Sequence, residues 1–389
     1  MTSTQTSTQH LENLDNQLLE WIIVGAGPAG IAGLGKLLDA GVSPEKILWI
    51  DPLFKVGDFG SSWKYISSNT PVEGFTKFFH RCQSFSYKPA SMIDNLPPEK
   101  NCPLILAAQP LQTITNHLKT LVHTELDTVT QIRPLDIANY LNPHWAITLN
   151  SGKVFHTKKL LLAMGGQPKE VNFPWIPSIP LSMAMDPNLL KKSLSPEDTV
   201  MVFGSAQSAK SILGHLKSIK LKKKVLFYRS STSFDRHIDS ESLEGVLALK
   251  ITPKNLLAQM PSCTKTISAI GFKRRHIPII GLPDDYGYDQ ETGEIAPGIF
   301  GLGMAFPNIM YHELGLAEYR VAALWPVMKR LEKLLPEWLS SPTQTVLMSE
   351  EKNIFKNQNQ ARDLKKSEVE SLSSPYVTAD LGTPDLLVV

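Results

Sequence analysis

The sequence predicts an α/β fold, because a buried strand, a glycine-rich turn, a helix and a further strand follow one another twice along the chain. The first of these units covers residues 21–51 and the second covers 199–228. The interval from Gly25 to Asp51 in the first unit is 26 residues, and that from Gly204 to Arg229 in the second is 25. This repeat predicts two Rossmann-like, three-layer dinucleotide-binding domains.

In the first unit, the apolar run 21–24 predicts a strand, 31–38 predicts a helix ended by Gly41, and 46–51 predicts the next strand. The turn between them has the pattern G-x-G-x-x-G. Its first glycine permits a tight turn, its second lets the backbone approach a pyrophosphate, and its third lets helix and strand pack closely. An acid after the second strand is placed to accept hydrogen bonds from ribose hydroxyls. The residues assigned to this site are Gly25, Gly27, Pro28, Ala29, Gly30 and Asp51.

In the second unit, 199–203 and 225–228 predict strands on either side of a helix that ends near Leu216. Alanine replaces the second and third glycines of its turn, which predicts a wider turn and a looser contact with a pyrophosphate. Arg229 stands where the first unit has its acid, with the lysines 222–224 just upstream. Arginine can pair with a 2′-phosphate that an acid would repel, so NADPH is favoured over NADH. The residues assigned to this site are Gly204, Ser205, Ala206, Ser208, Ala209, Arg229 and Ser230.

Two segments, 159–168 and 265–272, each run from an apolar strand into glycine. Each follows one nucleotide-binding motif, and we expect them to carry the chain from one unit to the other and back. The region 297–307 and the helical pattern 316–335 predict a last strand, a turn and a closing helix.

The chain has 389 residues, more than one hydrophobic core usually spans. The polar segment 1–17 is predicted to be a flexible lead-in, and 341–389 a disordered tail, because both have too little apolar content to offset the entropy of ordering. Between them, we expect the first nucleotide-binding domain at 18–166 and 296–340, with the second domain, 167–295, inserted into it.

The composition excludes several classes of protein. With 39 basic and 37 acidic residues the net charge is +2, which argues against binding to nucleic acid or to an anionic membrane. No signal peptide and no apolar stretch of about 18 residues occurs, so we expect a cytoplasmic protein without a membrane span. Cys82, Cys102 and Cys263 lie far apart, and we expect them to be buried small hydrophobes rather than a metal site or a redox-active disulfide. The motifs of serine hydrolases, zinc proteases and P-loop proteins do not occur.

The two units, the two crossovers and the closing segment resemble the flavoprotein oxidoreductases with two dinucleotide-binding domains, over residues 18–338. Within them, the resemblance is greatest to the flavin-containing monooxygenase branch and to FAD/NAD(P)-binding oxidoreductases whose second turn reads GSxxSA. The segments GSSW at 60–63 and SSNTP at 67–71 are similar to that branch's GGxW and Ser-Asn segments. The segments 303–307 and 318–320 look like its C-terminal strand and helix.

The resemblance implies that the first domain binds FAD and the second NADPH. It also implies that Asn69 is the catalytic residue, with its carboxamide beside the reactive face of the flavin. Further cofactor contacts are expected at Gly60, Trp63, Val129, Gly165 and Gly303.

Three departures from the family pattern leave the reaction open. The paired cysteines of disulfide reductases are missing, Met304 follows Gly303 where many relatives have an acid, and 179–186 stands where the monooxygenase signature FxGxxxHxxx is expected. One interpretation is a flavin monooxygenase that uses NADPH and molecular oxygen on a small organic substrate. The second is a dehydrogenase or reductase that passes electrons to a small acceptor. The third is a flavin-binding regulatory protein without turnover.

Overall fold

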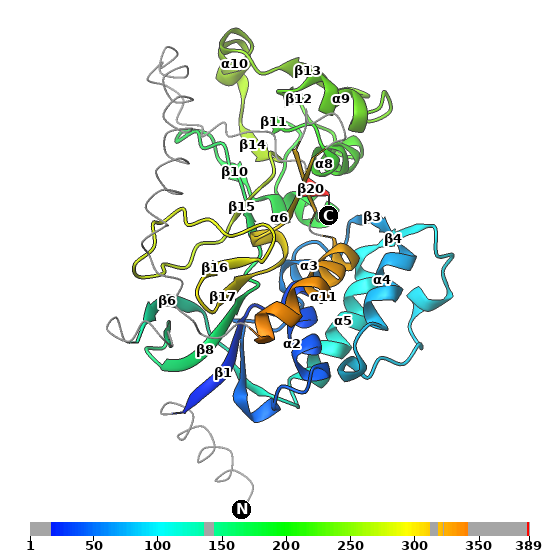
Figure 1. The fold of residues 1–389 in the computed structure, drawn as a ribbon. Coiled ribbons are helices and arrows are strands. Elements are labelled where there is room, and N and C mark those ends of the chain that lie inside the picture. The colour runs from blue at the N-terminus through cyan, green and yellow to red at the C-terminus, as the bar shows by residue number, and fades with distance from the viewer. Residues whose placement is uncertain (1–16, 136–143, 312–317, 322, 341–386, 389) are drawn as a thin grey trace, which may run out of the picture.

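The computed structural model describes residues 17–135, 144–311, 318–321, 323–340 and 387–388. Two main sheets organise this part of the chain, one of eight strands and one of five. Figure 1 shows the strands of the smaller sheet, β11 to β14 in green, at one end of the molecule and β1 and β8 of the larger sheet toward the other. The predicted fold class, with two Rossmann-like units and the second inserted into the first, is confirmed.

The larger sheet has the strand order β16-β17-β8-β1-β2-β5, with β7 paired to β8 and β6 paired to β7. Parallel pairing places Val24 beside both Ile50 and Leu162, so β1, β2 and β8 end at one edge of the sheet. The strands are β1 (Leu18–Val24), β2 (Ile47–Ile50), β5 (His123–Glu125), β6 (Val129–Pro134), β7 (Trp145–Leu149), β8 (Val154–Leu162), β16 (Glu294–Ala296) and β17 (Ile299–Gly301).

The smaller sheet is parallel throughout, in the order β10-β14-β11-β12-β13. Phe203 pairs with Phe227 on one side and Ser268 on the other, so β11, β12 and β14 also end together. The strands are β10 (Ser178–Ile179), β11 (Thr199–Phe203), β12 (Lys223–Tyr228), β13 (Leu247–Lys250) and β14 (Lys265–Ser268).

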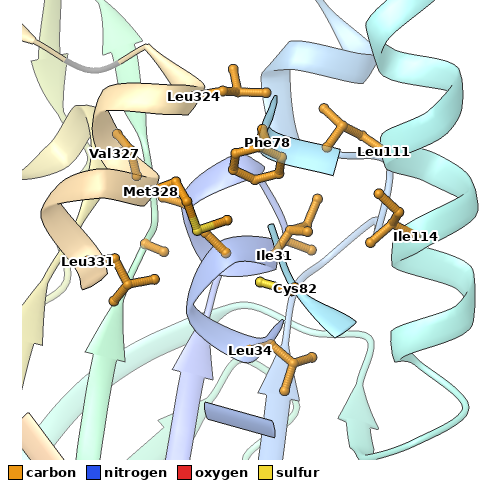
Figure 2. Close-up of a cluster of buried hydrophobic side chains, with 14 of the residues drawn as sticks. Ile31, Leu34, Phe78, Cys82, Leu111, Ile114, Leu324, Val327, Met328 and Leu331 are labelled. Carbon is orange, nitrogen blue, oxygen red and sulfur yellow. The ribbon is translucent and has the colours of Figure 1, made fainter. Parts of the chain in front are cut away.

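Side chains alternate along the strands of the larger sheet, so the sheet contributes to a core on each face. Helices cover one of these faces. Trp21 and Ile23 of β1 face a core made with helices, while Ile22 and Val24 face a second core on the other side. Figure 2 shows how residues of α2, α5 and α11 meet in the first core, with Cys82 among them. The longer helices of this core are α2 (Pro28–Asp39), α4 (Val72–Phe79), α5 (Leu104–Leu118) and α11 (Leu324–Ser340).

Side chains also alternate along the strands of the smaller sheet. Val200 and Val202 of β11 pack with α8 on one face, while Met201 and Phe203 pack on the other with Phe173. The helices on the first face are α6 (Leu181–Ala184), α7 (Pro187–Lys192), α8 (Gln207–Lys217) and α9 (Ser231–His237), and α10 (Pro253–Gln259) lies on the second.

Short elements join these layers. The helix α3 (Gly57–Ser61) is followed by β3 (Ser67–Pro71), which pairs with β4 (Asn101–Pro103). The two crossover segments pair with each other as β9 (Gly166–Pro168) and β15 (Phe272–Arg274). A further sheet contains β18 (Asn308–Tyr311), β19 (Glu318–Val321) and β20 (Leu387–Val388).

The closing helix is where the sequence prediction was wrong. The pattern 316–335 predicted one helix, but Glu318–Val321 is a strand paired with β18, and α11 begins only at Leu324. From Leu324 onward the apolar residues recur at helical spacing and are buried, which stabilises the helix there. Apart from Leu387–Val388, the predicted tail lies outside the described residues, as does 1–16 of the predicted lead-in.

Within the part of the chain that the structure describes, no helix combines the length and the apolar character needed to cross a bilayer. Cys82 and Cys102 are buried, as predicted, and Cys263 is half-buried. Burial raises the pKa of the Cys82 thiol to about 12 and that of Cys263 to about 11. Both side chains are therefore thiols rather than thiolates at neutral pH.

Candidate active site

The first glycine turn lies at the ends of β1, β2 and β8, and backbone hydrogen bonds hold it there. Gly25 has a φ of 105°, and a Cβ there would lie 2.4 Å from the carbonyl oxygen of Ala163, so only glycine fits. The backbone N–H of Gly25 donates to Ile50 at 2.8 Å, and that of Ala163 donates to Val24 at 2.8 Å. The turn therefore sits at the carboxyl edge of β1, between β2 and β8, where α/β sheets bind ligands.

The helix α2 begins directly after this turn with a free amino end. Gly27 is its N-cap residue and supplies no side-chain cap, and the first turn carries no acidic residue. Gly30 packs so closely that a Cβ there would lie 1.9 Å from the carbonyl oxygen of Gly25. A Cβ on Gly27 would instead meet only the Cα of Gly57, at 4.0 Å. Backbone N–H groups at such a helix end, with the positive end of the helix dipole, bind anions such as a pyrophosphate.

Asp51 holds the turn in place. Its side chain is buried, and its carboxylate accepts hydrogen bonds from the backbone N–H groups of Ala26 at 2.7 Å, Leu53 at 2.8 Å and Phe54 at 2.6 Å. A carboxylate has about four acceptor sites, so one remains for a ribose hydroxyl. Asp51 thus has a structural role that its position in the sequence did not reveal, and its contact with a ribose stays a prediction.

Two more glycines approach the same helix end. Gly303, predicted for this site, has a φ of 82°, and a Cβ there would lie 2.6 Å from the Cβ of Ala29. Gly57 was missed by the sequence analysis, yet its φ is 56° and a Cβ there would lie 3.1 Å from the Cα of Gly27. Val56 before it also has a positive φ, which is rare for a β-branched side chain. Strained backbone of this kind clusters at ligand sites.

The second turn repeats the geometry of the first. Gly204 has a φ of 129°, and a Cβ there would lie 2.1 Å from the carbonyl oxygen of Ala269. Its N–H donates to Phe227 at 2.9 Å, and the N–H of Ala269 donates to Phe203 at 2.7 Å. The helix α8 follows, with Ala206 as an N-cap that supplies no side-chain cap and with no acid in the first turn. A second helix end of the kind that binds anions therefore lies at the edge of the smaller sheet.

The other predicted residues of the two turns lie at the same helix ends. Pro28 is the first residue of α2, where its missing N–H costs no helical hydrogen bond. Ser205 is a buried residue just before α8, and Ser208 is the second residue of that helix. Ala209 is fully buried against the smaller sheet, so its methyl group fills the place of the third glycine without reaching a ligand.

Arg229 follows β12 at the same edge and is exposed. The hydroxyl oxygen of Ser230 caps α9 by accepting the N–H of Ser233 at 3.3 Å, and the Ser233 hydroxyl donates to the carbonyl oxygen of Ser205 at 3.4 Å. These bonds tie the segment after Arg229 to the glycine turn. Arg229 therefore lies directly after β12 and beside a segment that is bonded to the second glycine turn.

The lysines 222–224 precede Arg229 in sequence but lie away from it in the structure. Lys223 and Lys224 start β12 and lie at its amino end, opposite the edge that carries Arg229. Lys223 donates to the Gln259 side chain at 2.5 Å, and Lys224 donates to the carbonyl oxygen of Leu216 at 2.6 Å. They support no phosphate site, because a strand of six residues separates its two ends by about 17 Å.

Outside the two glycine turns lie four further predicted residues: Gly60, Trp63, Asn69 and Val129. Asn69 is exposed on β3, and Trp63 packs edge-on against Phe272 with ring centres 5.7 Å apart. A Cβ on Gly60 would lie 2.5 Å from a backbone carbonyl oxygen, so this glycine is required by packing. The Val129 side chain is buried in the second core, which leaves its backbone as the part able to bind a ligand.

Gly165 lies in the first crossover with a φ of 68°, beside the guanidinium of Arg275. Arg275 was not among the predicted residues, because nothing in the sequence signals a contact between two crossover segments.

Comparisons with known proteins agree with this geometry. No protein-family model matches the chain. Monooxygenase AgnR1 of Paecilomyces divaricatus is 25% identical over 82% of this chain and 98% of its own length. The crystal structure of the cadaverine monooxygenase DfoA of Erwinia amylovora, bound to FAD, superposes over 85% of this chain and 97% of its own, with a TM-score of 0.54 and 12% identity. A mutant flavin monooxygenase of Stenotrophomonas maltophilia covers 83% of this chain and 98% of its own, with a TM-score of 0.51 and 12% identity.

The fold is that of the flavin monooxygenases. The predicted resemblance to this branch is thus confirmed at the level of fold and of similarity to a named monooxygenase. One departure from the branch's pattern lies at the site itself. Met304 follows Gly303, and a Cβ on Gly166 would lie 3.2 Å from its sulfur. At this point the turn carries an apolar side chain rather than the acid that the resemblance implies.

The two glycines around α2 should differ in their effect on stability. Gly30→Ala should lower the free energy of unfolding by about 1–3 kcal/mol, the typical cost of overpacking, since the new methyl group meets backbone. Gly27→Ala should cost no more than about 1 kcal/mol, the size of a weakened N-cap. Urea unfolding followed by circular dichroism compares the two. Equal losses would contradict the packing described for Gly30.

Proposed function

We propose that the chain is an FAD-dependent, NADPH-using oxidoreductase, and that it acts as a flavin monooxygenase on a small organic substrate. The observation that carries the proposal is the pair of matching turns. Each places a glycine with positive φ against the alanine carbonyl of the next crossover, and each opens a helix without a side-chain cap. Two such sites in one chain suit two dinucleotides.

The residues present at the first site fit FAD. The N–H groups of Ala29 and Gly30 at the start of α2 would bind the pyrophosphate, and the absence of a side chain at Gly27 leaves room for it. Asp51 would accept from the ribose. The backbones of Gly57 and Gly303, which approach the same helix end, would enclose the nucleotide.

The residues at the second site fit NADPH. The amino end of α8 would bind its pyrophosphate, and Arg229 would pair with the 2′-phosphate. With both cofactors bound, the flavin would supply the two-electron redox chemistry that links NADPH to an acceptor such as oxygen. The protein's part is to hold the two rings at reacting distance, about 3 to 3.5 Å, and to exclude water.

Asn69 is proposed as the catalytic residue, on the similarity of its segment to the Ser-Asn segment of the flavin monooxygenases. Its neighbour Ser68 is buried, and the Ser68 hydroxyl accepts the N–H of Thr70 at 2.7 Å and donates to the Thr70 carbonyl at 2.9 Å. Side chains alternate along a strand, so Asn69 points away from Ser68 and is exposed. Its carboxamide can both donate and accept a hydrogen bond at the flavin.

The alternative is a dehydrogenase or reductase with a small acceptor, and one observation favours it. Residues 179–186 stand where the monooxygenase signature FxGxxxHxxx is expected, and they do not match it. A regulatory protein that binds flavin without turnover is the third candidate. All three bind FAD, so they are separated by what NADPH and oxygen do.

The proposal is tested by adding NADPH to the FAD-loaded protein without oxygen and then admitting oxygen. We expect NADPH to bleach the visible flavin absorbance. On admission of oxygen with a suitable small substrate, less peroxide than NADP⁺ should form, because oxygen enters the substrate. Peroxide equal to NADP⁺ with every substrate, together with fast turnover on a quinone, would indicate the reductase. Flavin that NADPH does not bleach would indicate the regulatory protein.

The variant Gly27→Val tests whether FAD binds at the first turn. Its side chain would fill the space beside the start of α2, so this variant should purify folded but colourless. A fully yellow Gly27→Val protein would overturn the placement of FAD at the first turn.

Arg229→Ala tests the assignment of NADPH to the second site. The Michaelis constant for NADPH should rise by about 10- to 100-fold, the size of a lost hydrogen bond to a charged group, while that for NADH should change little. Steady-state NADPH and NADH oxidation measure both constants. Equal losses with the two nucleotides would contradict a contact with the 2′-phosphate.

Asn69→Ala tests the catalytic role. The variant should keep its bound FAD and its rate of bleaching by NADPH, because neither depends on the carboxamide. The share of NADPH consumption that ends as peroxide should rise, because the hydrogen bond at the reactive face of the flavin is lost. An unchanged ratio of peroxide to NADP⁺ would rule out this role.

A further inference from the structure

The two segments that connect the sheets form a single joint. β9 and β15 pair antiparallel, with Gly166 opposite Arg274 and Pro168 opposite Phe272. Backbone bonds extend this two-stranded ribbon at both ends: the N–H of residue 275 donates to the carbonyl of residue 165 at 3.2 Å, and that of residue 169 donates to residue 271 at 2.9 Å. The chain therefore passes through this ribbon each time it crosses between the two sheets.

One end of the ribbon is attached to α3 by Arg275. Its Nη2 lies 2.7 Å from Oδ2 of Asp58, and its Nη1 donates to the carbonyl oxygen of Met164 at 3.2 Å. Asp58 directly follows Gly57, the residue that faces Gly27 at the start of α2. A single guanidinium thus joins the second crossover, the first crossover and the segment beside the first nucleotide site.

The other end of the ribbon is attached to the same segment by Trp63. Its ring packs edge-on against Phe272 at an interplanar angle of 86°. Trp63 also packs against the core clusters of both sheets, and its backbone N–H donates to the carbonyl oxygen of Asp58 at 3.0 Å. The segment 57–63 is therefore held to the ribbon at two points, one ionic and one apolar.

The ion pair between Arg275 and Asp58 contributes little to the stability of the fold. The side chains of Arg275 and Asp58 are 41% and 29% exposed, and ion pairs at such exposure are worth about 0–1 kcal/mol. The value of the bridge lies in its geometry, because arginine fixes both the carboxylate and the carbonyl through a rigid planar fork.

We propose that Arg275 is a positioning residue, which fixes segment 57–63 on the ribbon through Asp58 and Met164 and so sets the distance between the two nucleotide sites. This role rests on the proposed function. Hydride transfer requires the reacting rings at about 3 to 3.5 Å, and a misplacement of about 1 Å can cost about 100-fold in rate. A weak but rigid contact at the joint would then control the rate without controlling the fold.

Arg275→Gln tests the proposal in the FAD-loaded protein. The limiting rate of flavin bleaching by NADPH should fall by about 10-fold or more, while the FAD content, the Kd of NADPH and the melting temperature stay within error. Arg275→Lys should recover little, because lysine lacks the fork. Asp58→Arg combined with Arg275→Asp should recover part of the loss relative to either single change. A limiting rate for Arg275→Gln equal to that of the unaltered protein would overturn the proposal.

Lys153→Gln is the matched control. Lys153 pairs with Glu125 at 2.9 Å on the larger sheet and is 44% exposed, close to the value for Arg275. Its loss should leave the limiting rate unchanged. An equal loss of rate in both variants would show a general effect of removing an exposed ion pair and would overturn the specific role of Arg275.

Hydrogen exchange of the protein as purified, before NADPH is added, provides a second readout. In Arg275→Gln, amides in 57–63 and 164–169 should exchange about 10-fold faster, while those of β1 and β11 should not change. Unchanged exchange in both segments would overturn the positioning role. If NADPH fails to bleach even the unaltered protein but exchange increases as expected, the proposed function fails and the positioning role stands.

Discussion

The rest of the structure depends on one close approach, that of an alanine carbonyl to the first glycine of each turn. Ala163 and Ala269 place their oxygens where a Cβ of Gly25 or Gly204 would lie. The strand that ends just before this alanine, β8 or β14, can therefore pack beside β1 or β11 only when the first residue of the turn has no side chain. Parallel pairing brings the carboxyl ends of the strands to the edge where this contact lies, and the helix ends that face this edge are of the kind that bind anions.

The two turns also separate the roles of the motif's glycines. Ala206 and Ala209 replace the second and third glycines in the second turn, yet its two backbone hydrogen bonds, at 2.9 and 2.7 Å, match the 2.8 and 2.8 Å of the first. Only the first glycine is thus required by the backbone in both units. In the first unit the packing also requires glycine at Gly30, where a Cβ would lie 1.9 Å from the carbonyl oxygen of Gly25, whereas the space at Gly27 would admit a Cβ.

Local rules explain how much of this could be predicted. The apolar run at Thr199–Phe203 and the glycine turns depend on nearest neighbours, and the strands and helices around both turns were found within a few residues. Contacts between distant segments were not predictable in this way. Gly57, Arg275 and the strand at Glu318–Val321 each owe their place to a partner far away in sequence. The lysines upstream of Arg229 show the same limit, since Lys223 and Lys224 lie at the opposite end of β12 from Arg229.

The pairing of the two crossover segments has a consequence for how such a chain can change over time. Because Gly166 lies opposite Arg274, the inserted segment leaves and re-enters the larger sheet at one place. Insertions whose ends lie close together are tolerated well, since the host needs no rearrangement to accept them. The smaller sheet is in this sense an exchangeable unit: a chain could replace it with another α/β unit while the strands of the larger sheet keep their order.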